Sequence, residues 1–470
     1  MIQPISDPSV LEGYLTDASN LRGHADGLLR PRTTEEVAEI VRHCQRLAIP
    51  LTITAARTST TGSPVPFGGL LLSTELLHEI GPITHDTATA GAGVILGQLQ
   101  DAIEATGRFF PPDPTSRYDC TLGAAIACNA SGARTFKYGP TRPWIDALEV
   151  VLPTGEILHV RKGDPIPSGW PIPAWSEPDV KTAAGYAPPQ DLLDVFIGQE
   201  GTLGVVTRAV VRLTALPHDV IGLLAFFPDR ATAIAMVSTL RDAARATPDG
   251  ALSPRCIEYF DDQCLALARK RIEGVPDTAA CALFCEQEVA TADAQDSHLS
   301  AWWEALEADG ALASDTVIAT DDTSRKQLHA LRHAIPAGIN EEVVRNGMPK
   351  LGTDLSVPDS ALTTMMEAYD KAPIRHVLFG HIGNNHLHLN LLPKTPDELA
   401  TAKAFYDDLS RLAISLGGSV SGEHGIGKAK VKQLGWMVGD ATLAAFADLK
   451  RALDPHWILG RGTMIAAPTD

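Results

Sequence analysis

The chain has 470 residues, a length that predicts two or three domains with ample room for hydrophobic cores. Its formal net charge of −18 argues against nucleic acid and anionic membrane surfaces as main partners, and its 44% hydrophobic and 20% charged residues argue against global disorder. No apolar run approaches the ~20 residues of a membrane-spanning helix, and no signal peptide is apparent. The seven cysteines are scattered and include no Cys-x-x-Cys pair, so we expect a cytoplasmic protein without an iron–sulfur cluster.

A hydroxyl-rich loop follows the first predicted strand. Thr33 and Glu36 have the spacing of a helix capping box, and the apolar periodicity after them predicts a helix that ends before Pro50. Residues 51–54 are a predicted strand, and residues 56–64 then combine small and hydroxyl side chains with one cation, Arg57. Backbone N–H groups, hydroxyls and a guanidinium suit a bound pyrophosphate, although such loops are usually plain turns.

The rest of the first domain alternates short strands and helices. Residues 70–73 are a predicted strand, 98–106 a helix closed by Gly107, and 148–160 a hairpin. Residues 120–132 are rich in Ala and Gly, which lets a backbone press against a large planar group, with close helix packing as the alternative. Residues 161–190 contain seven prolines and predict an extended surface segment. A strand at 206–213 closes this domain near Pro217.

The second domain is predicted to alternate strands and helices. The predicted strands are 221–227, one near Ile257, 281–286 and 354–358. One helix is predicted to begin after Asp229, and three others are predicted at 300–308, 324–334 and 398–416. Cys281 and Cys285 lie in the third of these strands and look like core residues.

Five of the fifteen histidines fall between His376 and His424. If residues 386–391 form a strand, His386 and His388 share one face, and the turn at 383–385 could fold His381 back toward them. Glu423 and His424 follow in a Gly-rich loop. Imidazoles and a carboxylate bind divalent transition metals, and the spacing favours an open site over a closed zinc finger. The alternative is a set of separate histidines with ordinary partners.

Five motifs are spread over most of the chain. They are Ala-Arg-Thr-Ser-Thr-Thr-Gly at 56–62, Pro-Asp-Pro at 112–114 with Thr-Leu-Gly at 121–123, Gly-Gln-Glu-Gly-Thr-Leu-Gly at 198–204, Gly-His-Ile-Gly-Asn-Asn-His-Leu-His at 380–388 and Ser-Gly-Glu-His-Gly at 421–425. In this order they resemble the FAD-dependent D-2-hydroxyacid dehydrogenases of the vanillyl-alcohol-oxidase type, a group that includes D-lactate dehydrogenase, the glycolate oxidase catalytic subunit and D-2-hydroxyglutarate dehydrogenase.

The resemblance implies an α+β fold with a bipartite PCMH-type FAD-binding domain at 1–218, a ferredoxin-like cap domain at 219–410 and a C-terminal segment at 411–470 that completes the active site. It also implies contacts to non-covalent FAD. The expected cofactor-binding residues are Arg57, Thr58, Ser59, Thr60, Thr61, Gly62, Ser63, Pro112, Asp113, Thr121, Gly123, Asn129, Ser131, Glu200, Gly201 and Val206.

By the same resemblance, His381, His388 and Glu423 would bind a divalent metal, most often Zn²⁺ with Mn²⁺ or Fe²⁺ as alternatives, and His424 would be the catalytic base. A metal on the substrate hydroxyl and carboxylate lowers the hydroxyl pKa and orients the α-hydrogen toward the flavin. We expect Arg332 to bind the substrate carboxylate and Lys350 to provide a second contact to the substrate. The alternative for both residues is an ordinary surface charge.

Several positions depart from the family pattern. His386 replaces the usual Asn and is expected to contact substrate or to add a metal ligand. Lys350 is only near the position of the substrate lysine in the hydroxyglutarate enzyme, where this chain has Gly352. No histidine occurs in the Arg57 loop, where some relatives attach FAD covalently.

The expected partners are a small 2-hydroxy acid and an external electron acceptor, which would be a quinone, a cytochrome, an electron-transfer flavoprotein or oxygen. A homodimer and a peripheral position at the inner membrane are compatible with the sequence. Two other functions compete: a metal-dependent hydrolase, which leaves the Arg57 loop unexplained, and a non-catalytic flavoprotein subunit, which would not need the His/Glu set.

Overall fold

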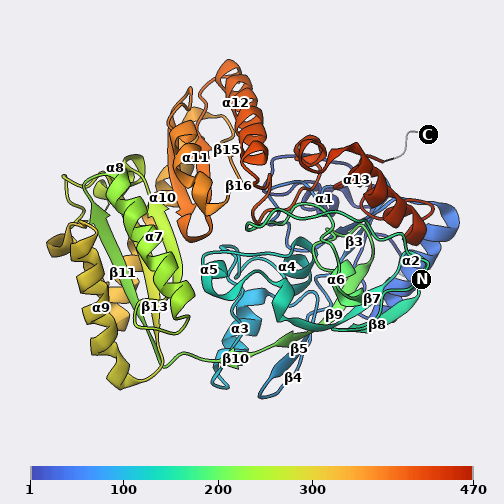
Figure 1. Cartoon of the computed structure of the whole chain (residues 1–470). Helices are drawn as coiled ribbons and strands as arrows, with labels where there is room; N and C mark the ends of the chain where they lie inside the picture. Colours follow the sequence, from blue (N-terminus) through green and yellow to red (C-terminus); the bar gives the residue numbers. More distant parts are fainter. Residues whose placement is uncertain (1–2, 272, 468–470) are drawn as a thin grey trace. The chain divides into compact units, whose positions relative to one another are not determined.

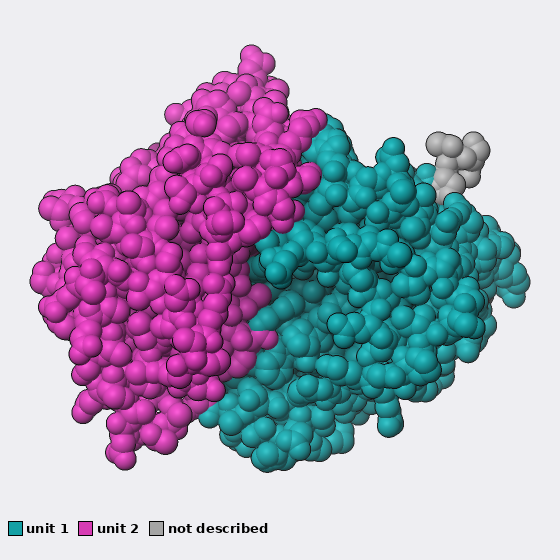
Figure 2. Space-filling view, viewed as in Figure 1, with its two compact units in different colours: residues 1–132, 139–216, 419–470 teal, residues 133–138, 217–418 magenta. Residues whose placement is uncertain are grey.

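A computed structural model describes residues 3–271 and 273–467, without the side chains of 322, 327, 329 and 331–333. The chain forms two compact units, coloured separately in Figure 2. Unit 1 comprises residues 1–132, 139–216 and 419–470, and unit 2 comprises 133–138 and 217–418. The short segment 133–138 therefore belongs to the second unit although it interrupts the first, and the described residues from 419 onward return to the first.

Unit 1 contains two principal sheets (Figure 1). The parallel sheet has the order β1 (Gly27–Leu29), β3 (Leu70–Ser73), β2 (Leu51–Thr54). The antiparallel sheet has the order β4 (Ile80–Ile83), β5 (Thr87–Gly91), β9 (Val205–Arg212), β7 (Ile145–Val151), β8 (Ile157–Arg161). A small ladder pairs β10 (Thr214–Ala215) with β6 (Arg108–Phe109).

The helices of unit 1 begin and end where capping groups permit. Thr33 caps α2 (Thr34–Leu47) through a bond from the N–H of Glu36, but the Glu36 carboxylate accepts from the N–H of Arg32 and not from that of Thr33. The apolar face of α2 packs with β2, β3 and β7 around Cys44. The other helices are α1 (Pro8–Glu12), α3 (Leu96–Glu104), α4 (Leu122–Cys128), α6 (Leu192–Val195) and α13 (Val431–Leu453).

Unit 2 is built on one sheet whose strands all pair antiparallel. Its order is β14 (Val317–Ala319), β11 (Asp219–Phe227), β13 (Cys281–Val289), β12 (Pro254–Phe260), β17 (His376–His381), β18 (His386–Leu391), β15 (Leu351–Gly352), and β16 (Leu355–Ser356) also pairs with β18. The predicted strand at 354–358 is thus reduced to two residues.

Helices alternate with the strands of unit 2, as predicted. They are α5 (Thr135–Tyr138), α7 (Arg230–Ala246), α8 (Asp262–Arg269), α9 (Gln295–Ala308), α10 (Asp322–Asn346), α11 (Leu362–Tyr369) and α12 (Pro396–Ser415). The core lies between the sheet and helices α8 and α10 and includes Phe226, Phe260, Phe284, Leu265 and Ile335. Burial of these large apolar side chains is the main stabilising term of the unit.

None of the described helices combines the length and the apolar composition that crossing a lipid bilayer requires. All seven cysteines are free thiols and six of them are buried. Cys281 and Cys285 are buried in β13, which confirms that they are core residues.

Candidate active site

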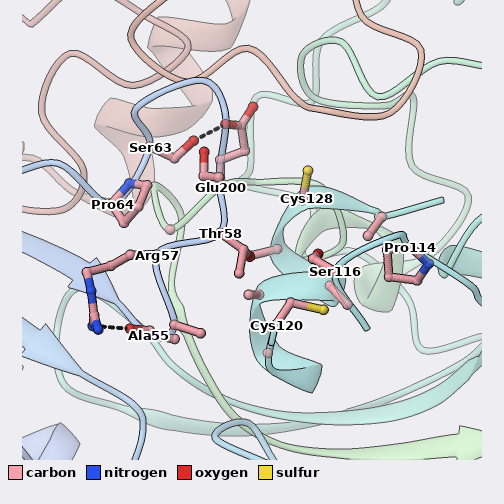
Figure 3. A pocket seen from close by; sticks show the side chains of 18 of the residues that line it. Ala55, Arg57, Thr58, Ser63, Pro64, Pro114, Ser116, Cys120, Cys128 and Glu200 are labelled. Atoms are coloured by element: carbon pink, nitrogen blue, oxygen red, sulfur yellow. Dashed lines mark hydrogen bonds between the residues drawn. The ribbon is translucent and has the colours of Figure 1, made fainter. Parts of the chain in front are cut away.

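Unit 1 contains a cavity of about 470 Å³, shown in Figure 3. Its walls come from the loop after β2, from helix α4 and the residues beyond it, and from the segment before β9. Ten of the predicted cofactor-binding residues line it: Arg57, Thr58, Ser59, Thr60, Ser63, Gly123, Ser131, Glu200, Gly201 and Val206. Glu423 and His424, which also belong to unit 1, line the same cavity.

The other six predicted cofactor residues are not in the cavity wall. They are Thr61, Gly62, Pro112, Asp113, Thr121 and Asn129, and their contact with the cofactor stays a prediction. Thr121 caps α4 by accepting from the N–H of Ala124 at 3.3 Å, and Asn129 ends that helix in a left-handed conformation with φ 49°. The Asn129 amide oxygen accepts from the N–H of Arg142 at 2.9 Å.

The Arg57 guanidinium has protein partners on three sides. It donates to the Ala55 carbonyl at 2.6 Å and to Glu75 at 3.1 Å, and it lies 4.3 Å from the centre of the Tyr14 ring. Its charge is therefore already paired by a carboxylate. Hydroxyls and backbone N–H groups of the loop are then the main candidates for phosphate contacts, and the phosphate role of Arg57 stays a prediction.

Two buried hydroxyls in the cavity wall lack a protein hydrogen-bond partner. They are Thr54 Oγ1, at the end of β2, and Ser131 Oγ, in the Ala/Gly-rich run. Buried polar atoms are almost always hydrogen-bonded, so such orphans indicate a ligand with polar atoms. The mostly small residues of α4, among them Gly123, Ala124 and Ala127, give the cavity a flat wall.

Glu200 fastens the loop that carries Glu423 and His424. Its carboxylate accepts from the backbone N–H groups of Ile426 and Gly427, both at 2.8 Å, and from the hydroxyl of Ser63. Burial raises the pKa of this carboxyl, and the three hydrogen bonds oppose that shift. A side chain at Gly425 would collide with the carboxylate, because its Cβ would lie 2.9 Å from Glu200 Cδ.

Thr61, in the loop after β2, also forms hydrogen bonds with the loop that carries Glu423 and His424. Its carbonyl accepts from the N–H groups of Lys428 and Ala429 at 2.9 and 3.0 Å, and its hydroxyl donates to the His424 carbonyl at 3.2 Å. Lys428 donates to the carbonyls of Gly62 and Ser63 at 3.3 and 3.0 Å, and burial lowers its pKa to about 8. No sequence pattern singles out Lys428 for this role.

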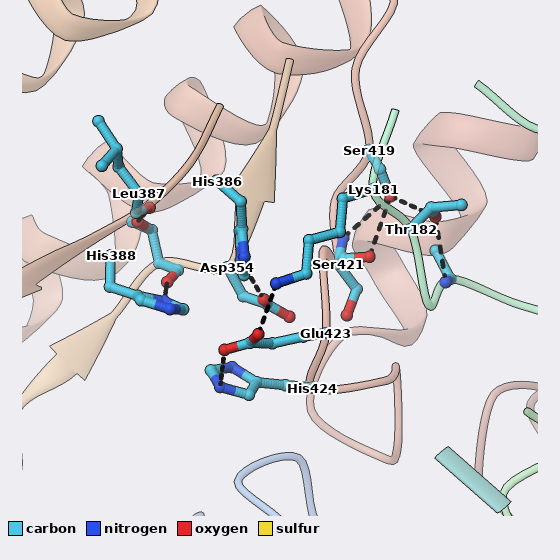
Figure 4. A network of polar contacts seen from close by, with 12 residues as sticks. Lys181, Thr182, Asp354, His386, Leu387, His388, Ser419, Ser421, Glu423 and His424 are labelled. Atoms are coloured by element: carbon cyan, nitrogen blue, oxygen red, sulfur yellow. Dashed lines mark hydrogen bonds and ion pairs between the residues drawn. The ribbon is translucent and has the colours of Figure 1, made fainter. Parts of the chain in front are cut away.

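Glu423 lies between a lysine and a histidine of its own unit (Figure 4). One carboxylate oxygen accepts from Lys181 Nζ at 2.7 Å, and the other lies 3.5 Å from His424 Nε2. The Lys181 and Glu423 side chains are 3% and 9% exposed, so this ion pair is largely shielded from water. Sequence analysis missed Lys181 because it lies in the proline-rich segment, which has no periodicity to mark it.

In unit 2 the hairpin β17–β18 brings three histidines together, with the turn at 383–385 between the two strands. His381 pairs with His386 across the hairpin, and the ring centres of His386 and His388 are 4.6 Å apart. Asn385 makes the turn with φ 50°. Gly380 leaves room for the His388 ring, since a Cβ there would lie 2.9 Å from His388 Cδ2.

Arg241 of α7 forms hydrogen bonds with the residues of this turn. Its guanidinium donates to the carbonyls of Gly383, at 3.0 Å, and Ile382, and to the amide oxygen of Asn385. The side chain is 4% exposed, and its NH1 lies 3.3 Å from the Asp359 carboxylate. The arginine thus fixes the connection that sets the register of the histidines. A basic residue on a surface-like helix gave no sequence signal for this role.

The two predicted substrate cations are in unit 2. Lys350 is exposed and donates to the Asn390 side chain at 3.1 Å. Arg332 belongs to α10, but its side chain lies outside the described part of the chain, so its role stays a prediction.

Two protein-family models match this chain, one in its N-terminal part and one in its C-terminal part. Residues 25–161 match the model of an FAD binding domain, and residues 223–464 match that of the C-terminal domain of FAD linked oxidases. Among solved structures, p-cresol methylhydroxylase with substrate bound aligns over 99% of this chain and 94% of its own with a TM-score of 0.74 at 16% identity. The 4-ethylphenol oxidase from Gulosibacter chungangensis aligns over the same shares with a TM-score of 0.71. These likenesses confirm the predicted fold class.

Curated relatives extend over nearly the full length. The glycolate oxidase subunit GlcD of Bacillus subtilis is 30% identical over 94% of this chain and 89% of its own. D-lactate dehydrogenase of Anaerostipes hadrus is 29% identical, covering 96% and 92%, and D-2-hydroxyglutarate dehydrogenase of Xanthomonas citri is 30% identical, covering 99% and 95%. The chain belongs to the FAD-linked oxidase family of flavin-dependent oxidoreductases.

Proposed function

We propose that this protein oxidises a small D-2-hydroxy acid to the 2-oxo acid, with dissociable FAD as the electron acceptor and a divalent metal ion that holds the substrate. The observation that carries the proposal is the composition of the cavity in unit 1. Glu423 and His424 lie in the same wall as the residues expected to bind the flavin. The names of the relatives, which act on glycolate, D-lactate and D-2-hydroxyglutarate, supply the substrate class.

The residues present fit FAD. The orphaned hydroxyls of Thr54 and Ser131 provide polar contacts, the small side chains of α4 provide a flat surface, and the cavity volume is typical of ligand sites. Bound FAD supplies the acceptor of the α-hydrogen and its bonding electrons. The loop at 56–63 contains no histidine to attach the flavin covalently, so we expect it to dissociate on dialysis against chaotropic salt.

The residues present also fit a divalent ion. His381 and His388 would supply imidazoles and Glu423 a carboxylate, a donor set that suits Zn²⁺, Mn²⁺ or Fe²⁺. Such an ion supplies Lewis-acid polarisation of the substrate hydroxyl. The substrate carboxylate would be held in addition by Arg332, and Lys350 would meet a second carboxylate on a longer acid.

His424 is the proposed proton acceptor. A neutral imidazole can take the hydroxyl proton of the substrate at one ring nitrogen as the α-hydrogen leaves with its electrons. Glu423 stands 3.5 Å from His424 Nε2 and stabilises the imidazolium that results. The loop that presents both residues is fixed by Glu200, so little ordering remains to be done when substrate binds.

An anaerobic absorption titration tests the proposal. The purified protein is mixed with D-lactate, L-lactate, D-malate, glycolate or D-2-hydroxyglutarate in separate cuvettes, and the flavin band is followed. We expect one acid to bleach the band and, where it is chiral, its L-enantiomer to leave it unchanged. A flavin band that no acid bleaches would overturn the substrate class, and a protein that binds no FAD would overturn the reaction.

A further inference from the structure

Three imidazoles of unit 2 lie close to one another. The ring centres of His381 and His386 are 5.5 Å apart, those of His381 and His388 are 5.5 Å apart, and those of His386 and His388 are 4.6 Å apart. One nitrogen from each ring can be chosen so that all lie within 4.8 Å of one another. His386 is as close to the group as the two histidines expected to bind metal.

Each of the three rings is oriented by an oxygen that can only accept a hydrogen bond from it. His381 Nδ1 contacts the Glu258 carboxylate at 2.6 Å, and His388 Nδ1 contacts the Thr353 carbonyl at 3.0 Å. His386 has the opposite orientation, with Nε2 on the Asp354 carboxylate at 2.7 Å. Each oxygen accepts from the nitrogen that it contacts, so a metal ion would be bound by the other ring nitrogen, which is Nε2 in His381 and His388 and Nδ1 in His386.

This pattern is the one that metal-binding histidines show. A ligating imidazole almost always donates its second N–H to a carboxylate or a backbone carbonyl, which fixes the ring and raises its basicity. An ordinary buried ion pair would explain the contact of His386 with Asp354, whose side chains are 0% and 1% exposed, but it would not explain an acceptor oxygen on one nitrogen of each of three adjacent rings. The shared pattern favours a common ligand.

We propose that His386 is a third imidazole ligand of the metal ion, bound through Nδ1, and that Asp354 is its positioning residue. The inference rests on the metal site of the proposed function and deepens it. Where the family resemblance places Asn, this chain has a nitrogen donor, so the site holds three imidazoles instead of two. A third imidazole strengthens binding of Zn²⁺ or Fe²⁺ more than that of Mn²⁺, which prefers oxygen ligands.

X-ray absorption at the zinc edge counts the imidazoles directly. FAD-loaded protein saturated with one equivalent of Zn²⁺ should show three imidazoles per zinc, and His386→Asn should show two. The matched control is His376→Asn, which removes another histidine of the same hairpin; its ring contacts the Ile374 carbonyl, and three imidazoles should remain.

Competition with a chromogenic chelator gives the affinity. We expect Asp354→Asn to weaken Zn²⁺ binding by roughly 10- to 100-fold, the usual effect of losing a carboxylate behind a ligand histidine. His386→Asn should weaken Zn²⁺ by at least as much, and it should weaken Mn²⁺ less than Zn²⁺. His376→Asn should leave both constants unchanged.

Removal of His386 alone leaves the buried Asp354 carboxylate without its imidazole and could prevent folding. The double variant His386→Asn/Asp354→Asn removes both partners, and circular dichroism checks that it folds. Two imidazoles in the wild type, or unchanged Zn²⁺ affinity in the double variant, would overturn the proposal. These measurements use no substrate, so a failure to oxidise 2-hydroxy acids would leave the ligand count standing, and a two-imidazole site that turns over would leave the proposed function standing.

Discussion

At the scale of single residues, the loop at 422–427 carries two ionisable side chains that line the cavity of unit 1, Glu423 and His424. Glu423 has a buried lysine on one oxygen and the imidazole of His424 near the other. Each oxygen of the Glu423 carboxylate can therefore interact with a different cationic group. Lys181 neutralises the group when no other cation is present, and His424 is placed to become charged when it accepts a proton.

His424→Ala tests the role of the base. The variant should keep FAD and metal, because the loop is held by Glu200 and not by the imidazole, yet stopped-flow flavin reduction should slow by roughly 10²- to 10⁴-fold. His456→Ala, a change at an exposed histidine, is the control and should reduce at the wild-type rate. Equal rates for His424→Ala and the wild type would remove the base from the reaction.

Lys181→Met tests the ion pair. In protein stripped of metal, the variant leaves the Glu423 carboxylate buried without its cation, which should cost about 3–5 kcal/mol of unfolding free energy. Added Zn²⁺ should raise the melting temperature more in the variant than in the wild type, since the ion replaces the missing charge. Lys162→Met, at an exposed lysine, should behave as wild type. A melting curve of Lys181→Met that coincides with wild type in the stripped protein would contradict the pairing.

At the scale of elements, the cavity depends on two loops that are joined by hydrogen bonds. Glu200 and Thr61 connect the loop after β2 with the loop before α13. The left-handed conformation of Glu200, with φ 51°, directs its carboxylate at both. Flavin binding and the position of His424 should therefore change together.

Glu200→Gln tests that connection. The amide keeps one acceptor but turns an N–H₂ group toward backbone donors, so hydrogen bonds worth about 1.5–3 kcal/mol each are lost or reversed. Hydrogen exchange at residues 425–427 should accelerate, and FAD should bind roughly tenfold or more weakly, as measured by fluorescence. Glu156→Gln makes the same change at an exposed position and is the control. Unchanged exchange at 425–427 would contradict the account.

At the scale of the whole molecule, periodicity and turn chemistry predicted many of the helices and strands but missed others, among them β5, α11 and α13. If residues 386–391 form a strand, His386 and His388 share one face because a strand has only two faces, and the turn at 383–385 could fold His381 back toward them; β17 and β18 have this arrangement. The strand after Pro50 was also predicted with its observed bounds. These features depend on neighbours in sequence.

Features that depend on distant residues were not predictable in this way. Lys181 reaches Glu423 across 242 positions, and Arg241 reaches the 382–385 turn across more than 140. Nor does any local pattern assign residues 133–138 to the second unit. Arg57 shows the converse, since a loop cation that suggested a phosphate contact is paired with Glu75.

Anaerobic single turnover with and without metal tests the central claim most directly. FAD-loaded protein is mixed with the acid that bleaches its flavin, and the 2-oxo acid is quantified after chelator treatment, after Zn²⁺ is restored, and without treatment. We predict one 2-oxo acid per FAD in the untreated and restored samples and a strongly reduced yield in the stripped one. Equal yields in all three samples would contradict the proposal that a divalent metal ion is needed for oxidation of the substrate by the flavin.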